Sequence, residues 1–211
     1  MKSILVLNAK IVNEGKVTER DLLVRDGHIE RIDSDLSSLT ADEVLDASGL
    51  HLFPGLIDDQ VHFREPGITH KATIASESQA AVAGGVTSYM EMPNVSPPTT
   101  SMERLREKHS IAARDSLANY SFYLGATNDN LEEIKAAPSC EIPGVKVFMG
   151  SSTGNMLVDD ESILDNLFRH APTLIATHCE DTPTILENEQ AAQSKYGNEV
   201  PFHLHPEIRS R

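Results

Sequence analysis

The 211-residue sequence has no tryptophan, and its four tyrosines and six phenylalanines supply few aromatic rings. It is also poor in basic residues, with 18 lysines and arginines against 32 aspartates and glutamates, a formal net charge of −14 at pH 7. Base-stacking surfaces need aromatic side chains, and nucleic-acid or anionic-membrane binding needs clustered lysine and arginine. We therefore expect neither nucleic acid nor a membrane as a partner.

Cysteine and long apolar runs are also scarce. The two cysteines, Cys140 and Cys179, form no disulfide framework, so we expect reduced thiols in a cytoplasmic protein. The apolar run near the N-terminus, residues 4–7, is only four residues long. A secretory signal needs roughly 7–15 apolar residues and a membrane span about 20. The sequence thus predicts neither a signal peptide nor a transmembrane segment.

The composition, 39% hydrophobic and 24% charged, is that of a globular chain with room for one large or two small domains. Residues 1–50 contain short apolar-rich segments separated by turn residues. Asp26-Gly27 lies between two such segments and is typical of a type I′ hairpin turn, and residues 13–16 predict another turn. We predict that residues 1–50 form a small antiparallel β module, with its first strands at 3–7 and 10–12.

Residues 51–211 alternate between strand and helix signals. The predicted strands are 52–57, 86–90, 120–124, 145–148 and 174–177. Thr100 to Glu103 resembles a capping box, Thr182-Pro183 opens another helix, and Gly84-Gly85 ends one. This order predicts an α/β fold with parallel strands. About five βα units fit, whereas a complete (β/α)₈ barrel takes about 250 residues. The segment is either an open five-stranded sheet or the first part of a TIM-type barrel.

A polar cluster, residues 58–67, follows the first of these strands. His62 is a candidate metal ligand, Gln60 lies on the same side of an extended strand, and Arg64 offers two parallel donors to a carboxylate. By itself, His62 is better explained as a hydrogen-bonded loop histidine than as a metal ligand. The next strand is followed by Asn94, whose amide could join Arg64 in a clamp for a small acid.

Lys146 is the second unusual residue, because it lies inside the apolar strand 145–148. Burying an ammonium is costly unless it is paired or neutralised. One route is a lowered pKa and reaction with carbon dioxide, which gives a carbamate able to bridge two cations. The alternative is an edge-strand lysine whose head reaches solvent.

His178 ends the strand 174–177 and precedes acidic residues that could orient its imidazole. Its neighbour Cys179 has no spaced partner and is interpreted as a buried small apolar residue. His203 and His205 have ligand spacing, but flanking prolines predict a structural loop. Residues 150–155 are interpreted as a mobile rim loop, since their spacing is not that of a phosphate-binding loop.

Taken in order, these segments resemble the amidohydrolase superfamily, and most closely the dihydroorotases that use a carboxylated lysine. The matching segments are GLIDDQVHFREPG (55–67), EMPNVSPPTT (91–100), GVKVFMGSSTGNM (144–156) and THCED (177–181). The resemblance implies a partial TIM-type barrel and the reversible cyclisation of N-carbamoyl-L-aspartate to dihydroorotate, in pyrimidine biosynthesis. It also implies that His62, carboxylated Lys146 and His178 contact zinc, which would activate water, and that Arg64 and Asn94 hold the substrate carboxylate.

Two features depart from the family pattern. Gln60 stands where the family has the first histidine of a His-x-His pair, and an amide oxygen is a weaker ligand, so we expect one or two zinc ions with a weak first site. The family's fourth metal histidine and its catalytic aspartate lie on later strands. We therefore expect the general base beyond Arg211, and an inactive chain as it stands.

Other functions are compatible with the same residues. Dihydropyrimidinases (hydantoinases) and allantoinases act on related cyclic ureides, although the Arg64–Asn94 clamp favours dihydroorotase. Because of Gln60, a non-catalytic dihydroorotase-like scaffold is a further alternative, as is an open α/β domain with a binding role. The sequence leaves open whether the protein forms a homo-oligomer.

Overall fold

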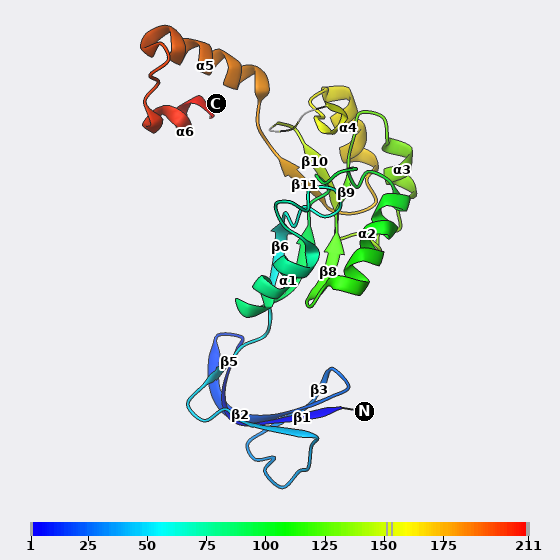
Figure 1. Ribbon diagram of the computed structural model, residues 1–211, viewed down its shortest axis with the longest axis vertical. Coiled ribbons are helices and arrows are strands. Elements are labelled where there is room, and N and C mark those ends of the chain that lie inside the picture. Colours follow the sequence, from blue (N-terminus) through cyan, green and yellow to red (C-terminus); the bar gives the residue numbers. More distant parts are fainter. Residues whose placement is uncertain (1, 151, 153, 210–211) are drawn as a thin grey trace. The chain divides into compact units, whose positions relative to one another are not determined.

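The computed structural model describes residues 2–150, 152 and 154–209. The chain divides into two compact units, Met1–Leu56 and Ile57–Arg211 (Figure 1). Among the described residues, no helix is long and apolar enough to cross a membrane.

The first unit is one five-stranded sheet. Its strands are β1 (Ser3–Asn13), β2 (Lys16–Arg25), β3 (His28–Asp33), β4 (Glu43–Asp46) and β5 (His51–Leu52), in the order β3-β2-β1-β4 with β5 also paired to β1. The predicted hairpin turn at Asp26-Gly27 is confirmed, since both residues have positive φ, 50° and 78°. The prediction of a purely antiparallel module is wrong, because β4 and β5 pair parallel with β1. The two strands predicted at 3–7 and 10–12 are one strand, β1, with an irregularity between Val6 and Ala9.

The second unit alternates strands with helices. Its elements are β6 (Leu56–Val61), α1 (Ile74–Ala83), β7 (Val86–Glu91), α2 (Met102–Asp115), β8 (Asn119–Phe122), β9 (Leu124–Gly125), α3 (Leu131–Ala136), β10 (Val145–Phe148), η1 (Gly154–Met156), α4 (Glu161–His170), β11 (Ile175–His178), α5 (Thr182–Tyr196), η2 (Phe202–Leu204) and α6 (His205–Ile208). The sheets have the orders β6-β7-β8 and β9-β10-β11, and the pairs β7–β8, β9–β10 and β10–β11 are parallel. The predicted mixed α/β class is therefore confirmed.

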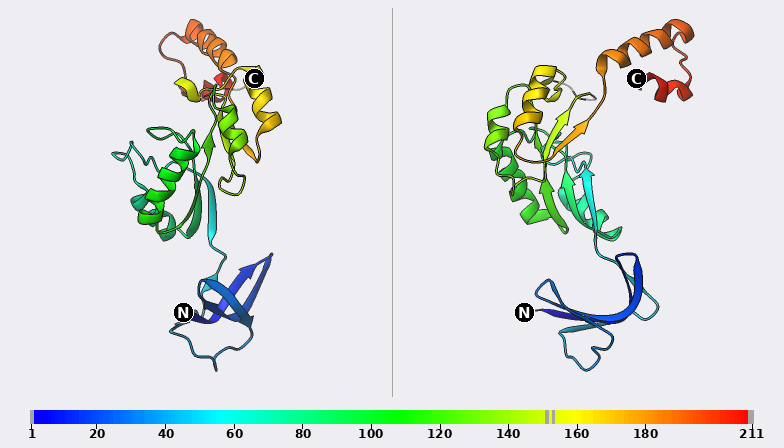
Figure 2. Two further views of the ribbon diagram at one scale, coloured as in Figure 1. Left: turned by 90° about the vertical axis from the view of Figure 1, so that its right-hand side faces the viewer. Right: turned by 180° about the vertical axis from the view of Figure 1, so that it is seen from behind.

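The hydrophobic core lies between the strands and the helices α1 to α4. The helices contribute Ile74, Leu105, Ile134 and Leu167, and the strands contribute Tyr89, Phe122, Leu124, Val145 and Val147. Helices α2, α3 and α4 lie along the same side of the strands in Figure 1 and in the rotated views of Figure 2. The opposite side of the strands is therefore available to carry polar side chains.

Several element boundaries differ from the predicted ones. Residues 53–55, which include Pro54, separate β5 from β6, and the strand predicted at 120–124 is divided at Tyr123. Ser101, not Thr100, caps α2: its backbone is extended and its Oγ accepts a hydrogen bond from the Arg104 amide at 3.3 Å. The capping residue is displaced because the helix begins one residue later than predicted, at Met102.

Candidate functional site

The alternation of side chains along β10 separates two faces of the sheet. Val145 and Val147 pack in the core beneath the helices, so Lys146 and Phe148 point to the other face. His178 on β11 is the register partner of Phe148 and lies on that same face. Lys146 and His178, which come from different motifs, are therefore on adjacent strands and share the face away from the helices.

The same alternation places His62 on this face. Val61 contacts the core and Phe63 is part of it, so His62 between them points the opposite way. Its Nδ1 lies 2.8 Å from Oδ1 of Asn94, which joins the segments that follow β6 and β7. Burial lowers the pKa of His62, the contact with Asn94 opposes that shift, and the positive charges of Arg64 and Lys146 add to it. The imidazole is thus held in its neutral, metal-binding form.

Lys146 is 3% exposed, and its Nζ lies 5.0 Å from the centre of the Phe148 ring. The interpretation as an edge-strand lysine is wrong, because β10 pairs with β9 on one side and β11 on the other. Burial lowers the pKa of the Lys146 amine. A lowered pKa increases the fraction of the neutral amine, which is the reactive form of a lysine side chain.

His178 is held by the residue two positions further along. Its Nε2 lies 3.2 Å from Oε1 of Glu180, and Arg209 Nη1 donates to the other carboxylate oxygen at 2.7 Å. Cys179 is exposed, which corrects its interpretation as a buried residue, because it follows the last residue of β11 and is not part of the core. The loop predicted around His203 and His205 is instead formed by η2 and α6.

Arg64 lies in a loop that fits closely against the loop of Asn94. Its φ is 70°, and its backbone amide donates to Oε1 of Glu91 at 3.0 Å. The Ser96 amide donates to the Pro66 carbonyl at 3.1 Å, and a Cβ added to Gly67 would lie 1.8 Å from the Ser96 carbonyl oxygen. Only glycine fits at position 67, so the two loops are locked side by side.

A pocket of about 490 Å³ opens beside Asn94. The residues that line it are Asn94, Val95, Pro98, Thr100, Thr127, Ser152, Asn155 and Met156. Its volume is within the range of small-molecule sites. Thr127 and Asn155 follow β9 and β10 and were missed, although the rule that functional residues follow parallel strands could have found them. The loop predicted at 150–155 lies partly outside the described residues, at positions 151 and 153.

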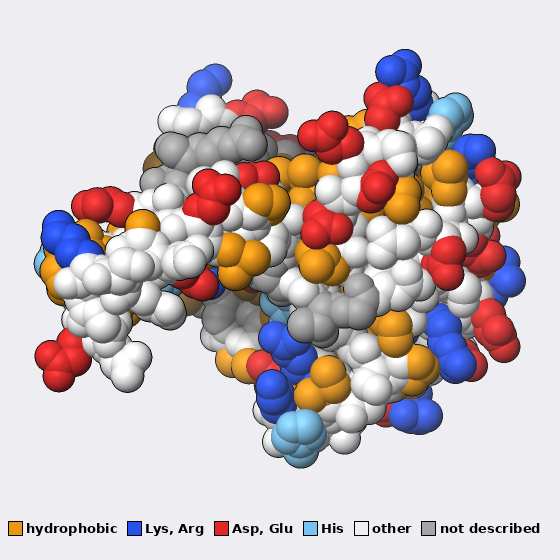
Figure 3. Space-filling model, turned by 90° about the horizontal axis from the view of Figure 1, so that it is seen from above, with side chains coloured by type: hydrophobic (Ala, Val, Ile, Leu, Met, Phe, Trp, Pro, Cys, Tyr) orange, Lys and Arg blue, Asp and Glu red, His pale blue; other side chains and the backbone are white. Residues whose placement is uncertain are grey.

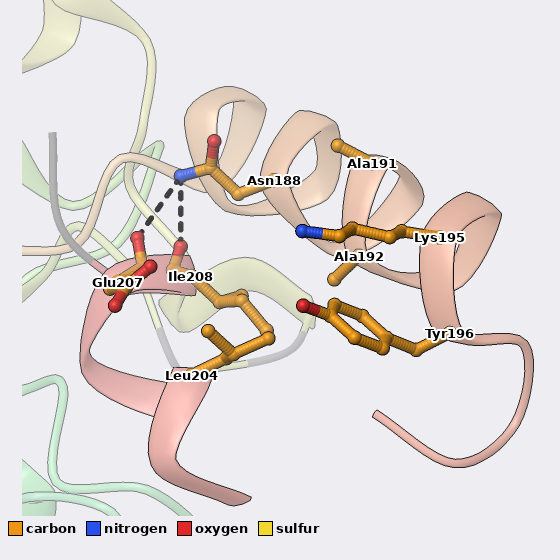
Figure 4. Close-up of a pocket in the computed structure, with 8 residues that line it drawn as sticks. All are labelled: Asn188, Ala191, Ala192, Lys195, Tyr196, Leu204, Glu207 and Ile208. Atoms are coloured by element: carbon orange, nitrogen blue, oxygen red, sulfur yellow. Dashed lines mark hydrogen bonds between the residues drawn. The ribbon is translucent and has the colours of Figure 1, made fainter. Parts of the chain in front are cut away.

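A second pocket, of about 310 Å³, lies between α5 and α6 (Figure 4). Asn188 on α5 donates to the carbonyls of Ile208 and Glu207, at 3.1 and 3.5 Å, and so holds the two helices together. None of the site residues predicted from the sequence lines this pocket. Acidic side chains are spread over the face of the molecule drawn in Figure 3, in keeping with the net charge of −14.

His62, Lys146 and His178 share the face away from the helices, and their side chains are of types that can bind a metal, the lysine after modification. Among the described residues, no group of three or more histidine, cysteine, aspartate or glutamate side chains is placed to hold a metal ion. His62 and His178 each have one ring nitrogen beside a side-chain oxygen, of Asn94 and Glu180, an arrangement that orients the other nitrogen toward a metal. The buried amine of Lys146 shares their face and can supply oxygen ligands as a carbamate.

Comparison with known proteins places the chain in a family. Residues 49–194 match the family described as Dihydro-orotase-like. An allantoinase of Deinococcus radiodurans is 33% identical over 92% of this chain and 45% of its own length, and a dihydroorotase of Methanosarcina acetivorans is 30% identical over 99% and 44%. The solved L-hydantoinase (dihydropyrimidinase) from Arthrobacter aurescens has a TM-score of 0.86 at 28% identity, covering 93% of this chain and 45% of that one. The chain spans less than half the length of these relatives, and it belongs to the dihydro-orotase-like family.

Proposed function

We propose that the chain is the first part of a (β/α)₈ barrel, residues 51–211, preceded by a β module, residues 1–50. The support is that the strands lie in chain order within each sheet, β6-β7-β8 and β9-β10-β11, and that helices precede β7, β8, β10 and β11. In a doubly wound sheet the strand order reverses at a switch point. In a (β/α)₈ barrel the strands follow one another around the barrel in chain order, without such a reversal.

The whole protein is proposed to be a zinc-dependent dihydroorotase that interconverts N-carbamoyl-L-aspartate and dihydroorotate. His62, His178 and a carboxylated Lys146 would hold one or two zinc ions. When bound, zinc would supply a Lewis acid for the amide carbonyl and lower the pKa of water. The neutral Lys146 amine adds to the carbon of CO₂ and releases a proton, and this leaves a carbamate with two oxygens on the face away from the helices.

The contact between His62 and Asn94 carries this proposal. It brings the segment 55–67, which holds the candidate metal ligand His62, against the segment 91–100, which holds the candidate substrate residue Asn94. Arg64 belongs to the same interlocked loops, and its guanidinium suits a carboxylate. Allantoin and hydantoin lack the carboxylate that dihydroorotate carries. The arginine therefore favours dihydroorotase over the allantoinase and hydantoinase activities named for the relatives.

The test uses the full-length protein with dihydroorotate and, as a substrate without a carboxylate, hydantoin. A hydrogen bond to a charged group contributes about 1.5–3 kcal/mol, so Arg64→Ala should lower kcat/KM for dihydroorotate roughly 10- to 100-fold. Asn94→Ala should lower it too, because His62 also loses its partner. Arg114→Ala, at an exposed arginine of α2, is the control. Unchanged kinetics in both variants would remove the substrate assignment, and no activity with less than one zinc per chain would favour a scaffold.

A further inference from the structure

A buried ion pair lies directly behind the candidate site. Glu91 ends β7 and Lys108 lies in the middle of α2, and the side chains of both are 0% exposed. Oε2 of Glu91 is 2.9 Å from Nζ of Lys108, and that Nζ is 5.0 Å from the centre of the Phe122 ring. Glu91 begins the matched segment 91–100, but neither Glu91 nor Lys108 was among the candidate site residues.

Stability alone is a poor explanation for the pair. Burial raises the pKa of Glu91 and lowers that of Lys108, while the charge of each partner opposes the shift of the other. Desolvation of two charges consumes most of their attraction, and apolar replacements of buried pairs are often neutral or stabilising. A specific role in the structure around the pair is therefore a better explanation.

The remaining hydrogen bonds of the pair go to the two loops of the site. Oε1 of Glu91 accepts the backbone amides of Phe63 and Arg64, at 2.9 and 3.0 Å. Lys108 Nζ donates to the carbonyl of Met92 at 3.2 Å, two residues before Asn94. The pair thus binds the backbone on both sides of the contact between His62 and Asn94.

Glu91 binds the backbone where its conformation is unfavourable, at Phe63 and Arg64. Arg64 has a φ of 70°, and a left-handed conformation is unfavourable for a residue with a side chain. Its amide and that of Phe63 converge on one carboxylate oxygen, which favours this conformation over an extended one. The turn made at Arg64 determines where the side chains on either side of it point.

We propose that Glu91 and Lys108 are positioning residues: the Glu91 carboxylate fixes the turn at residues 63–64 that aims His62 and Arg64 into the site, and Lys108 neutralises it and ties it to the Asn94 loop. This inference rests on the proposed function, since it gives His62 and Arg64 their roles. The part played by Glu91 is that of a hydrogen-bond acceptor, which can be separated from its part in the ion pair.

The test uses two variants of the full-length protein. Glu91→Asp keeps the charge but withdraws the carboxylate from the amides by one methylene. The double variant Glu91→Gln, Lys108→Met removes both buried charges and keeps an oxygen acceptor. The matched control, Arg104→Met with Glu107→Gln, removes an exposed ion pair from the same helix.

We expect Glu91→Asp to speed hydrogen exchange at the Phe63 and Arg64 amides about tenfold without affecting the amides of α2, and to weaken zinc binding about 10- to 100-fold, as loss of an outer-shell partner does. The double variant and the control should stay close to the wild-type protein on both measurements. A larger effect in the double variant than in Glu91→Asp would contradict the proposal. Equal effects in these two variants, or no effect of Glu91→Asp, would likewise show that the ion pair has only a structural role.

Fast exchange of the Phe63 and Arg64 amides in the wild-type protein would overturn the inference without any variant, so the test does not depend on every variant folding. Failure of the proposed function would be seen elsewhere. The wild-type protein would then bind no zinc and hydrolyse no cyclic amide, while the exchange measurements would still report on Glu91.

Discussion

Among single residues, Lys146 shows most clearly what the structure adds to the sequence. A lysine in an apolar strand was conspicuous in the sequence, but two explanations remained. The structure excludes the solvent-reaching one, because Lys146 is on a central strand and almost fully buried. Such a residue has a cost to stability, as is common where a protein prepares a site for function.

Replacing Lys146 by methionine should therefore stabilise the metal-free, full-length protein in CO₂-free buffer. Burial lowers the folded-state pKa below the usual 10.5, so between these two values the unfolded chain binds more protons and stability rises with pH. Lys146→Met should remove this rise and raise Tm at pH 7 by roughly 1–2 °C for each kcal/mol recovered, because relatives of the full-length protein are about twice as long as this chain. Thermal melts from pH 7 to pH 10 measure both effects.

Lys71→Met, at an exposed lysine, is the matched control and should leave the melting curves unchanged. An equal or lower Tm for Lys146→Met, with the same pH dependence as the wild-type protein, would contradict the view that the buried amine is a strained feature.

At the scale of elements, the site is made by loops that follow parallel strands. The order of strands and helices was predictable, because apolar segments and glycine or proline breaks are local signals. The exact ends were not: Ser101 caps α2 in place of Thr100, and β5 and β6 replace one predicted strand. Such shifts depend on which backbone groups find partners in the folded molecule, and this information is not local.

The interlocking of the loops can be tested at Gly67. Gly67→Ala meets both a φ of 82° and the Ser96 carbonyl oxygen, whereas Gly85→Ala meets a similar φ of 87° with nothing within 4 Å. Both substitutions incur the left-handed penalty, so we expect Gly67→Ala to reduce the free energy of unfolding by about 1–3 kcal/mol more. Chemical denaturation of the two variants measures the difference, and equal losses would show that the loops are not tightly packed.

At the scale of the whole molecule, the edge strands of the second unit affect how the chain associates. β6 is an edge strand of one sheet of the second unit and β11 an edge strand of the other. Ile57 in β6 is 66% exposed, and Leu174 just before β11 is 62% exposed. Exposed strand edges with apolar neighbours pair readily with other chains. A barrel closed by further strands would cover them.

We accordingly expect the isolated chain of residues 1–211 to self-associate or to be poorly soluble. Size-exclusion chromatography with light scattering, over a range of concentrations, measures this directly. A monodisperse monomer with a cooperative melt would count against the interpretation as part of a barrel and in favour of an independent open α/β domain.

The sequence by itself determined the kinds of elements, the hairpin at Asp26-Gly27 and the residue types available for metal and carboxylate binding, because these follow from local periodicity, turn chemistry and side-chain chemistry. Only the tertiary structure decided which of them meet. It placed His62 against Asn94, buried Lys146 on a central strand and set Glu91 with Lys108 behind both loops. Those contacts join residues 16 to 32 positions apart in the chain, and strand pairing and core packing, not local sequence, bring such residues together.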